Sequence, residues 1–243
     1  MKIMIGVSTS GYLRNASFLE YYSALKRPAN SLGAFVHGQS PARGRNHLFQ
    51  LAIQQDCTHI LLLDDDVCPP DDIIEKLIRH DKDIVTGVLL KRDFPHHPIL
   101  GYSTDSGGRW GVQFLHELPG EGLIPIKTCG LGCVLIKTSV FKTLEPFNVT
   151  QTDPTAPPAW VTLGKSVPDH WCDDTDFFIR CTDLGIELFC DLSVVVGHMS
   201  QLTIWPRFEN GQWMTIYDVG SKDNLKFGTV RPVEPVVEDA VSK

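Results

Sequence analysis

The chain has 243 residues and a mass of 27.1 kDa, a length that favours one large domain over two full domains. Hydrophobic residues make up 42% of the chain and charged residues 21%, a composition that excludes disordered and fibrous proteins. Lys and Arg number 22 against 29 Asp and Glu, and the resulting net charge of −7 disfavours nucleic-acid binding outside a local basic patch.

Apolar runs and cysteines suggest where the protein resides. The longest apolar run beside charged residues, Ile60–Leu63, is far shorter than the about 20 residues of a membrane span. The N-terminus has the pattern of a first strand and not of a secretory signal. Seven cysteines without a C-x-x-C pair predict reduced, buried thiols and a cytoplasmic protein.

Strand-like and helix-like segments alternate through the first hundred residues, which predicts an α/β fold with a mostly parallel sheet. Strands are predicted at Lys2–Val7, Leu32–Val36, His59–Leu63, Ile84–Leu90 and Glu187–Val196. The segment Thr128–Ile136 is predicted to form a Gly-Leu-Gly turn followed by a strand. Helices are predicted at Asn15–Leu25, Pro41–Gln55, Asp71–His80, Ser139–Leu144 and Asp173–Gly185. Residues 93–125 are predicted to form hairpins and loops, and residues 148–170 a long binding loop or lid.

The residues after the first strand are polar. Ser8, Thr9 and Ser10 stand at the carboxyl end of this strand, where open α/β sheets place their ligands. We expect them to offer backbone groups and hydroxyls to a base and ribose.

An acidic triplet, Asp64, Asp65 and Asp66, follows the central strand directly. Three adjacent carboxylates raise one another's pKa unless a divalent cation takes their oxygens as ligands. Mg²⁺ or Mn²⁺ bound in this way usually completes its shell with phosphate oxygens and water, so the triplet predicts a metal and a diphosphate ligand. The alternative is a solvated turn in which Asp65 or Asp66 caps the next helix.

Six segments carry a resemblance to a known family; they are Ala42–Asn46, His59–Val67, Thr128–Ile136, Trp171–Arg180, Gly185–Leu188 and Val196–His198. They form three motifs that occur in the same order as those of the GT-A nucleotide-sugar glycosyltransferases, family 2-like enzymes with a DXD motif, and resemble them. The acidic triplet resembles the DXD motif itself. The resemblance covers roughly residues 2–200. It implies a Rossmann-like three-layer α/β/α sandwich.

The resemblance implies a metal-dependent transfer of sugar from a nucleotide-diphosphate sugar, preferably a UDP-sugar, to a hydroxyl acceptor. Asp64 would face the ribose or a metal-bound water, and Asp66 would bind Mn²⁺ or Mg²⁺ directly. Asp65 would be one of the nucleotide-binding residues and would point away from the metal. Because all three positions of the triplet are Asp, the roles of the three acids can be shifted by one residue. His198 would be the third metal ligand. Arg45 would contact the nucleotide, the alternative being a solvated arginine.

Asp173 and Asp174 stand where the family carries an acidic pair. The resemblance implies that Asp174 removes the proton of the acceptor hydroxyl in an inverting reaction, and that Asp173 contacts the acceptor. In a retaining enzyme, Asp174 would orient the acceptor instead. The same residues also suit the N-terminus of a helix, whose dipole favours acids.

Several features leave alternatives open. Lys91 and Arg92 follow a predicted strand and are expected to be solvated, the alternative being contact with phosphate or with the acceptor. The predicted domain division is a catalytic domain at 1–204, a C-terminal extension at 205–230 and a disordered tail at 231–243. The aromatic residues of the extension either close over the site or pack on the core; they are Trp205, Phe208, Trp213 and Tyr217.

Two other function classes fit the same residues. One is a nucleotidyl- or phosphoryl-transfer enzyme that uses the carboxylates and metal around a nucleoside triphosphate. The other is a non-catalytic binder of sugar nucleotides. The acceptor stays open among a saccharide, a protein, a small molecule and a modified DNA base.

Overall fold

The computed structural model describes residues 1–9, 16–92, 96–106, 109–115, 118–146, 158–161, 173–200, 203–218 and 225–229. The strands are β1 (Ile3–Thr9), β2 (Ser31–His37), β3 (His59–Asp64), β4 (Val67–Cys68), β5 (Ile84–Leu89), β6 (Leu100–Ser106), β7 (Arg109–Phe114), β8 (Leu123–Ile126), β9 (Thr128–Cys129), β10 (Cys133–Lys137), β11 (Leu188–His198), β12 (Thr203–Glu209), β13 (Gln212–Asp218) and β14 (Leu225–Thr229). The helices are α1 (Ala16–Ala24), α2 (Pro41–Gln54), α3 (Ile73–Ile78), α4 (Val140–Thr143) and α5 (Asp173–Asp183).

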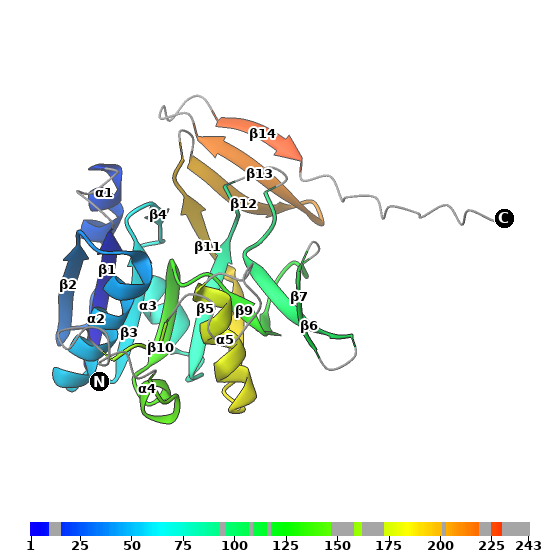
Figure 1. Ribbon diagram of the computed structural model, residues 1–243. Helices are drawn as coiled ribbons and strands as arrows, with labels where there is room; N and C mark the ends of the chain where they lie inside the picture. Colours follow the sequence, from blue (N-terminus) through cyan, green and yellow to red (C-terminus); the bar gives the residue numbers. More distant parts are fainter. Residues whose placement is uncertain are drawn as a thin grey trace.

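One large sheet runs through the molecule (Figure 1). Its order is β14-β13-β12-β11-β5-β10-β3-β1-β2, with β4 and β8 paired to the two ends of β11. β1 pairs in parallel with β2 and β3, and β5 pairs in parallel with β11. β10 lies antiparallel between β3 and β5. β2, β1, β3, β5 and β11 therefore point the same way, which confirms the mostly parallel central sheet.

Helices cover both faces of the sheet, because the central strands are apolar on both sides. In β3, Leu62 belongs to a core cluster that also contains Phe49 of α2 and the buried aromatic residues of α4 and α5. The next residue, Leu63, points to the other face and packs in a cluster with Phe18 of α1 and the apolar side of α3. This pattern is typical of buried strands between two helix layers. It confirms the predicted three-layer α/β/α sandwich.

The carboxyl ends of the parallel strands meet at one edge of the sheet, where ligands bind in this architecture. Ser8 of β1 lies opposite Asp64 of β3. The two-residue strand β4 folds back onto the end of β11, where Val67 pairs with His198. The acidic triplet and the end of β11 are thereby held beside each other, although they are far apart in the sequence.

Strands β12, β13 and β14 extend the sheet beyond β11 (Figure 1). Trp205 packs closely against Gly197 of β11, and its ring centroid lies 6.1 Å from that of Tyr21 in α1. Trp213 donates its Nε1–H to the carbonyl of Leu118 at 3.1 Å. These contacts pack the extension on the core. The side chain of Tyr217 and the tail 231–243 lie outside the described part of the chain.

The six cysteines that the structure describes are free and buried; they are Cys57, Cys68, Cys129, Cys133, Cys181 and Cys190. Burial raises the pKa of Cys181 to about 12, so its thiol stays protonated and unreactive at neutral pH. Within the described residues, no helix has the length and apolar character needed to cross a membrane.

A bulge in β11 shifts its pairing with β5 directly after Asp191. Asp191 is 2% exposed and accepts hydrogen bonds from the Ser193 N–H at 2.9 Å, His80 Nε2 at 2.7 Å and Arg79 Nη2 at 3.1 Å. Because the bulge sets how β11 continues toward the acidic triplet, these bonds stabilise the strand that carries one side of the site.

We expect Asp191→Asn to lower the free energy of unfolding at pH 7 by about 1–3 kcal/mol, the range for losing hydrogen bonds to a buried charged group. Burial acts to raise the pKa of Asp191, but the hydrogen bonds from His80 and Ser193 outweigh it, and the pKa is lowered. The ionised form therefore stabilises the fold above the unfolded-state pKa of about 3.9, and this contribution is lost as the pH falls below that value.

Urea unfolding at pH 7 and at about pH 3 checks this expectation. The stability difference between wild type and Asp191→Asn should shrink at the lower pH, because the Asp191 carboxyl of the unfolded chain is then mostly protonated, and this proton uptake favours the unfolded state of the wild type. The matched control is Asp83→Asn, since the Asp83 side chain is 46% exposed. An equal difference at both pH values would contradict the assigned role.

Candidate active site

Two acids from different segments share one arginine. Asp64 ends β3, and Asp174 lies in the first turn of α5. Arg45 Nη1 donates to Asp174 Oδ1 at 2.5 Å, and Arg45 Nη2 lies 3.2 and 3.1 Å from the two carboxylate oxygens of Asp64. The Arg45 side chain is 6% exposed, so this guanidinium compensates the charge of both acids in a place largely shielded from water.

The turn between β9 and β10 touches both of these acids. The N–H of Leu131 donates to Asp174 Oδ2 at 2.9 Å, and the N–H of Asp64 donates to the carbonyl of Gly132 at 2.8 Å. A Cβ atom on residue 132 would lie 2.8 Å from Asp64 Oδ2, closer than real Cβ contacts. This close approach explains why glycine stands in the turn at that position.

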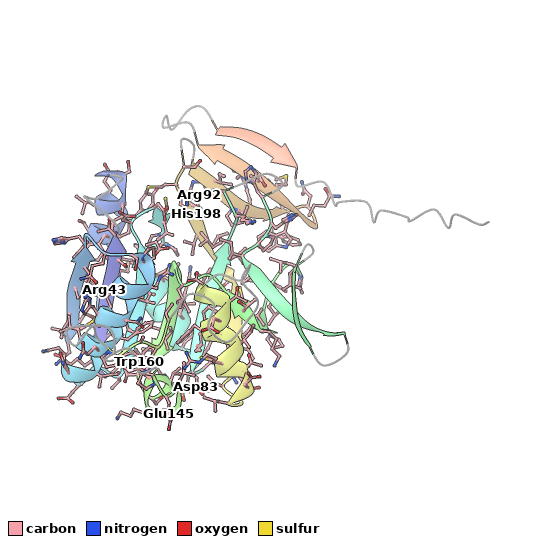
Figure 2. All side chains as sticks on the ribbon, viewed as in Figure 1. Arg43, Asp83, Arg92, Glu145, Trp160 and His198 are labelled. Carbon is pink, nitrogen blue, oxygen red and sulfur yellow. The ribbon has the colours of Figure 1, made fainter. Side chains whose placement is uncertain are left out.

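Asp66 and His198 form a second cluster at the same edge. His198 Nε2 lies 3.7 Å from Asp66 Oδ1, and His198 Nδ1 lies 2.8 Å from the carbonyl oxygen of Leu90. Because a carbonyl only accepts hydrogen bonds, Nδ1 carries a proton, and in the neutral ring Nε2 presents its lone pair toward Asp66. Arg92 Nη1 donates to the other oxygen of Asp66 at 2.8 Å. Figure 2 shows Arg92 and His198 next to each other above the central sheet.

The second cluster fits a divalent cation with two protein ligands. Ligand atoms about 2.1 Å from one ion lie roughly 3.0–3.6 Å apart, close to the 3.7 Å between His198 Nε2 and Asp66 Oδ1. The bond from His198 Nδ1 to a backbone carbonyl is the support that metal-binding histidines usually have. Asp64 is bound to Arg45 instead. Across the described ranges, no three His, Cys, Asp or Glu side chains are close enough together to hold a metal ion.

The environment of Asp66 favours a bound cation. Burial raises the pKa of Asp66, the positive charge that His198 carries when it is protonated opposes this effect, and the neighbouring Asp64 carboxylate adds to it. Arg92 also acts against the rise, but its side chain is 44% exposed. A carboxylate that is costly to ionise gains most from a positive charge placed beside it.

The other predicted binding residues are turned into the protein. Thr9 Oγ1 donates to Asp65 Oδ2 at 2.5 Å, and both residues are buried. Ser8 is also buried, and its hydroxyl lies against Gly44 of α2, where a Cβ would overlap it. Asp65 thus points away from the second cluster. Outside the described residues lie Ser10 and the side chain of Asp173.

Sequence reasoning assigned no role to Asn46, which follows Arg45 in α2. Its Oδ1 accepts from the N–H groups of Trp160 and Val161 at 2.9 and 3.0 Å, and its Nδ2 donates to the Val161 carbonyl at 2.8 Å. Asn46 therefore attaches segment 158–161 to α2 beside the shared arginine. The sequence could have indicated this role, because an asparagine beside the apolar face of a helix requires buried hydrogen-bond partners. The rest of the predicted loop 148–170 lies outside the described residues.

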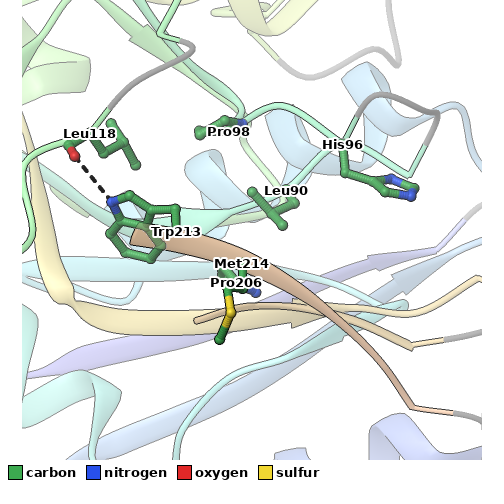
Figure 3. A pocket seen from close by; sticks show the side chains of 7 residues that line it. All are labelled: Leu90, His96, Pro98, Leu118, Pro206, Trp213 and Met214. Carbon is green, nitrogen blue, oxygen red and sulfur yellow. Dashed lines mark hydrogen bonds between the residues drawn. The ribbon is translucent and has the colours of Figure 1, made fainter. Parts of the chain in front are cut away.

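A small cavity lies between the β12–β13 hairpin and the segment that follows β5 (Figure 3). Its walls are Leu90, His96, Pro98, Leu118, Pro206, Trp213 and Met214. Its volume of about 20 Å³ has room for about one water molecule and is too small for a sugar. The ring of Trp213 thus fills this space with packing contacts and leaves no sugar-sized pocket there.

Comparisons with known proteins give a likeness in fold. No family model and no curated protein matches the sequence. The crystal structure of A197 from STIV matches over 94% of this chain and 95% of its own, with a TM-score of 0.50 and 14% identity. This likeness shows that the two proteins share the fold over almost their whole length. The structure of S. aureus TarS 1-349 in complex with UDP-GlcNAc covers 78% of this chain and 56% of its own, with a TM-score of 0.41 and 9% identity.

Proposed function

We propose that the protein is a glycosyltransferase that transfers a sugar from a nucleotide-diphosphate sugar to a hydroxyl group. The proposal depends on the observation that two clusters lie at one edge of the sheet. The first consists of Arg45, Asp64 and Asp174, and the second contains Asp66 and His198; the acidic triplet connects them. Asp66 and His198 suit a cation for a diphosphate, and Asp174 is a carboxylate suited to a hydroxyl nucleophile. The motif resemblance supports the same conclusion, with the triplet as the DXD motif.

Asp66 and His198 would hold Mn²⁺ or Mg²⁺, with water and diphosphate oxygens at the remaining positions. A cation bound there neutralises negative charge on the diphosphate leaving group. The half-exposed Arg92 bonds to the same carboxylate, so its guanidinium is placed to contact that diphosphate as well. Asp64 would face the ribose, on the first-strand side of the site.

Asp174 would take the proton of the attacking hydroxyl in an inverting reaction. Each of its oxygens receives a protein hydrogen bond, one from Arg45 and one from the N–H of Leu131. A carboxylate oxygen has two lone pairs, so a carboxylate that is held by protein donors can also accept a hydrogen bond from a hydroxyl group. The guanidinium keeps Asp174 ionised, the form that a base requires, while making it a weaker proton acceptor. In a retaining reaction, the same carboxylate would orient the acceptor hydroxyl.

A thermal-shift screen tests this proposal. The purified protein is measured with UDP-, GDP-, ADP- and CMP-sugars, UDP-GlcNAc among them, each with and without Mn²⁺. A ligand at 100 times its Kd stabilises a protein by about 2.7 kcal/mol, enough for a clear rise in Tm. We expect the Tm to rise with one nucleotide class and only with Mn²⁺ present, and we expect that sugar nucleotide to release its nucleoside diphosphate.

The same screen separates the other function classes. A shift with nucleoside triphosphates, followed by pyrophosphate release, would indicate a nucleotidyl transferase. Metal-dependent binding of a sugar nucleotide without any turnover would indicate a binding protein. Either result would overturn the proposed reaction.

A further inference from the structure

Arg45 is more deeply buried than the two acids that it binds. Its side chain is 6% exposed, whereas those of Asp64 and Asp174 are 31% and 18% exposed. The carboxylates are therefore the groups that a substrate can reach, and the guanidinium lies behind them. A role for Arg45 in the reaction has to act through Asp64 and Asp174.

The geometry requires an arginine. Nη1 donates to Asp174 and Nη2 to Asp64, so the two ends of one planar guanidinium hold acids that are far apart in the sequence. A lysine ammonium is a compact charge on a flexible stem and has no such rigid fork. Arg45 itself is held in α2, whose next residue, Asn46, is anchored by three hydrogen bonds.

The β9–β10 turn completes the arrangement from the other side. Leu131 donates its N–H to the second oxygen of Asp174, and Gly132 accepts the N–H of Asp64. Donors on both carboxylate oxygens determine how the carboxylate of Asp174 is rotated. The position of Asp174 is thus determined by Arg45 and Leu131. Both are also connected to Asp64, because Arg45 binds its carboxylate and Leu131 precedes Gly132, which accepts its N–H.

We propose that Arg45 is a positioning residue that connects the donor-side acid Asp64 to the acceptor-side acid Asp174, and that it holds Asp174 ionised and oriented toward the acceptor. This inference rests on the proposed function for its role in the reaction. It differs from the expected contact between Arg45 and the nucleotide, because Arg45 acts through the two acids and touches no substrate.

The test compares Arg45→Lys and Arg45→Met with wild type. The first readout needs no substrate: the carboxyl group of Asp174 is titrated by carbon-detected NMR. Its pKa should rise in both variants, more in Arg45→Met, because the guanidinium is lost. The matched control is Arg207→Lys, since Arg207 is an exposed arginine whose Nε lies 3.3 Å from Glu209 on the β12–β13 hairpin. An Asp174 titration that is unchanged in both Arg45 variants would overturn the proposal.

The second readout is turnover, measured as release of nucleoside diphosphate with Mn²⁺. Arg45→Lys should lower kcat by about tenfold or more and change the donor KM less than about threefold, with the acidic limb of the pH profile moved to higher pH. A purely structural role would lower activity without moving this limb and would contradict the proposal. If wild type itself shows no turnover, the proposed function fails, and the NMR titration still decides whether Arg45 controls Asp174.

If neither Arg45 variant folds, Asp64→Asn, Asp174→Asn and the double variant replace them. Acids that share one arginine should give non-additive losses, so the double variant should lose less turnover than the product of the single losses. The same cycle applied to unfolding in urea reports the coupling without any substrate. Losses that multiply in both measurements would overturn the proposal.

Discussion

Asp66→Ala should abolish the metal-dependent binding of nucleotide sugars and leave the fold intact. Asp66 is one of two side chains placed to bind the cation, and its Oδ1 lies 3.7 Å from His198 Nε2. Even residues that only support metal ligands usually change affinity by about 10–100-fold, so losing a ligand should weaken Mn²⁺ binding by about 100-fold or more. Calorimetric titration with Mn²⁺ and the nucleotide identified in the screen measures the effect.

The fold should survive this substitution, because the strand pairing of β4 with β11 uses backbone groups. The matched control is Asp83→Ala, at the opposite end of β5 (Figure 2). This control should bind metal and nucleotide as wild type does. Undiminished Mn²⁺-dependent affinity in Asp66→Ala, in a sample with an unchanged circular dichroism spectrum, would refute the metal site.

Asp174→Asn should retain donor affinity and lose turnover by about 100-fold or more, the size expected for removal of a general base. An amide has one acceptor oxygen and one donor nitrogen, so it cannot accept from both Arg45 and the N–H of Leu131. A loss of about 1–2 kcal/mol in the free energy of unfolding should accompany the change. Single-turnover release of nucleoside diphosphate, donor affinity and Tm are the three measurements.

The control for this variant is Asp183→Asn, because Asp183 is an exposed residue at the far end of α5. Its turnover should equal that of wild type. Near-normal transfer by Asp174→Asn would remove Asp174 from the role of base.

Proton NMR of the first product formed adds a second criterion, because an inverting reaction yields the anomer opposite to that of the donor. Retention would instead support the orienting role.

Local sequence patterns were sufficient to predict the fold class and the sheet edge that carries the acidic triplet. Ile60–Leu63 is apolar at every position, so this strand had to be central and covered on both faces. Carboxylates that directly follow such a strand have to emerge at its end, and this alone places the acidic triplet at the sheet edge. Both conclusions depend on which side chains are buried, and this can be inferred from the order of apolar and charged residues along a short stretch of sequence.

The pairing of the polar groups, in contrast, depends on the tertiary fold. Arg45 lies 19 residues from Asp64 and 129 residues from Asp174, and no local pattern shows that one guanidinium reaches both. The distance between Asp66 and His198 depends on β4 folding back onto β11, and Arg92, expected to be solvated, donates to Asp66. Periodicity reports whether a side chain is buried, whereas its hydrogen-bond partner depends on strand order and register, which many distant residues set together.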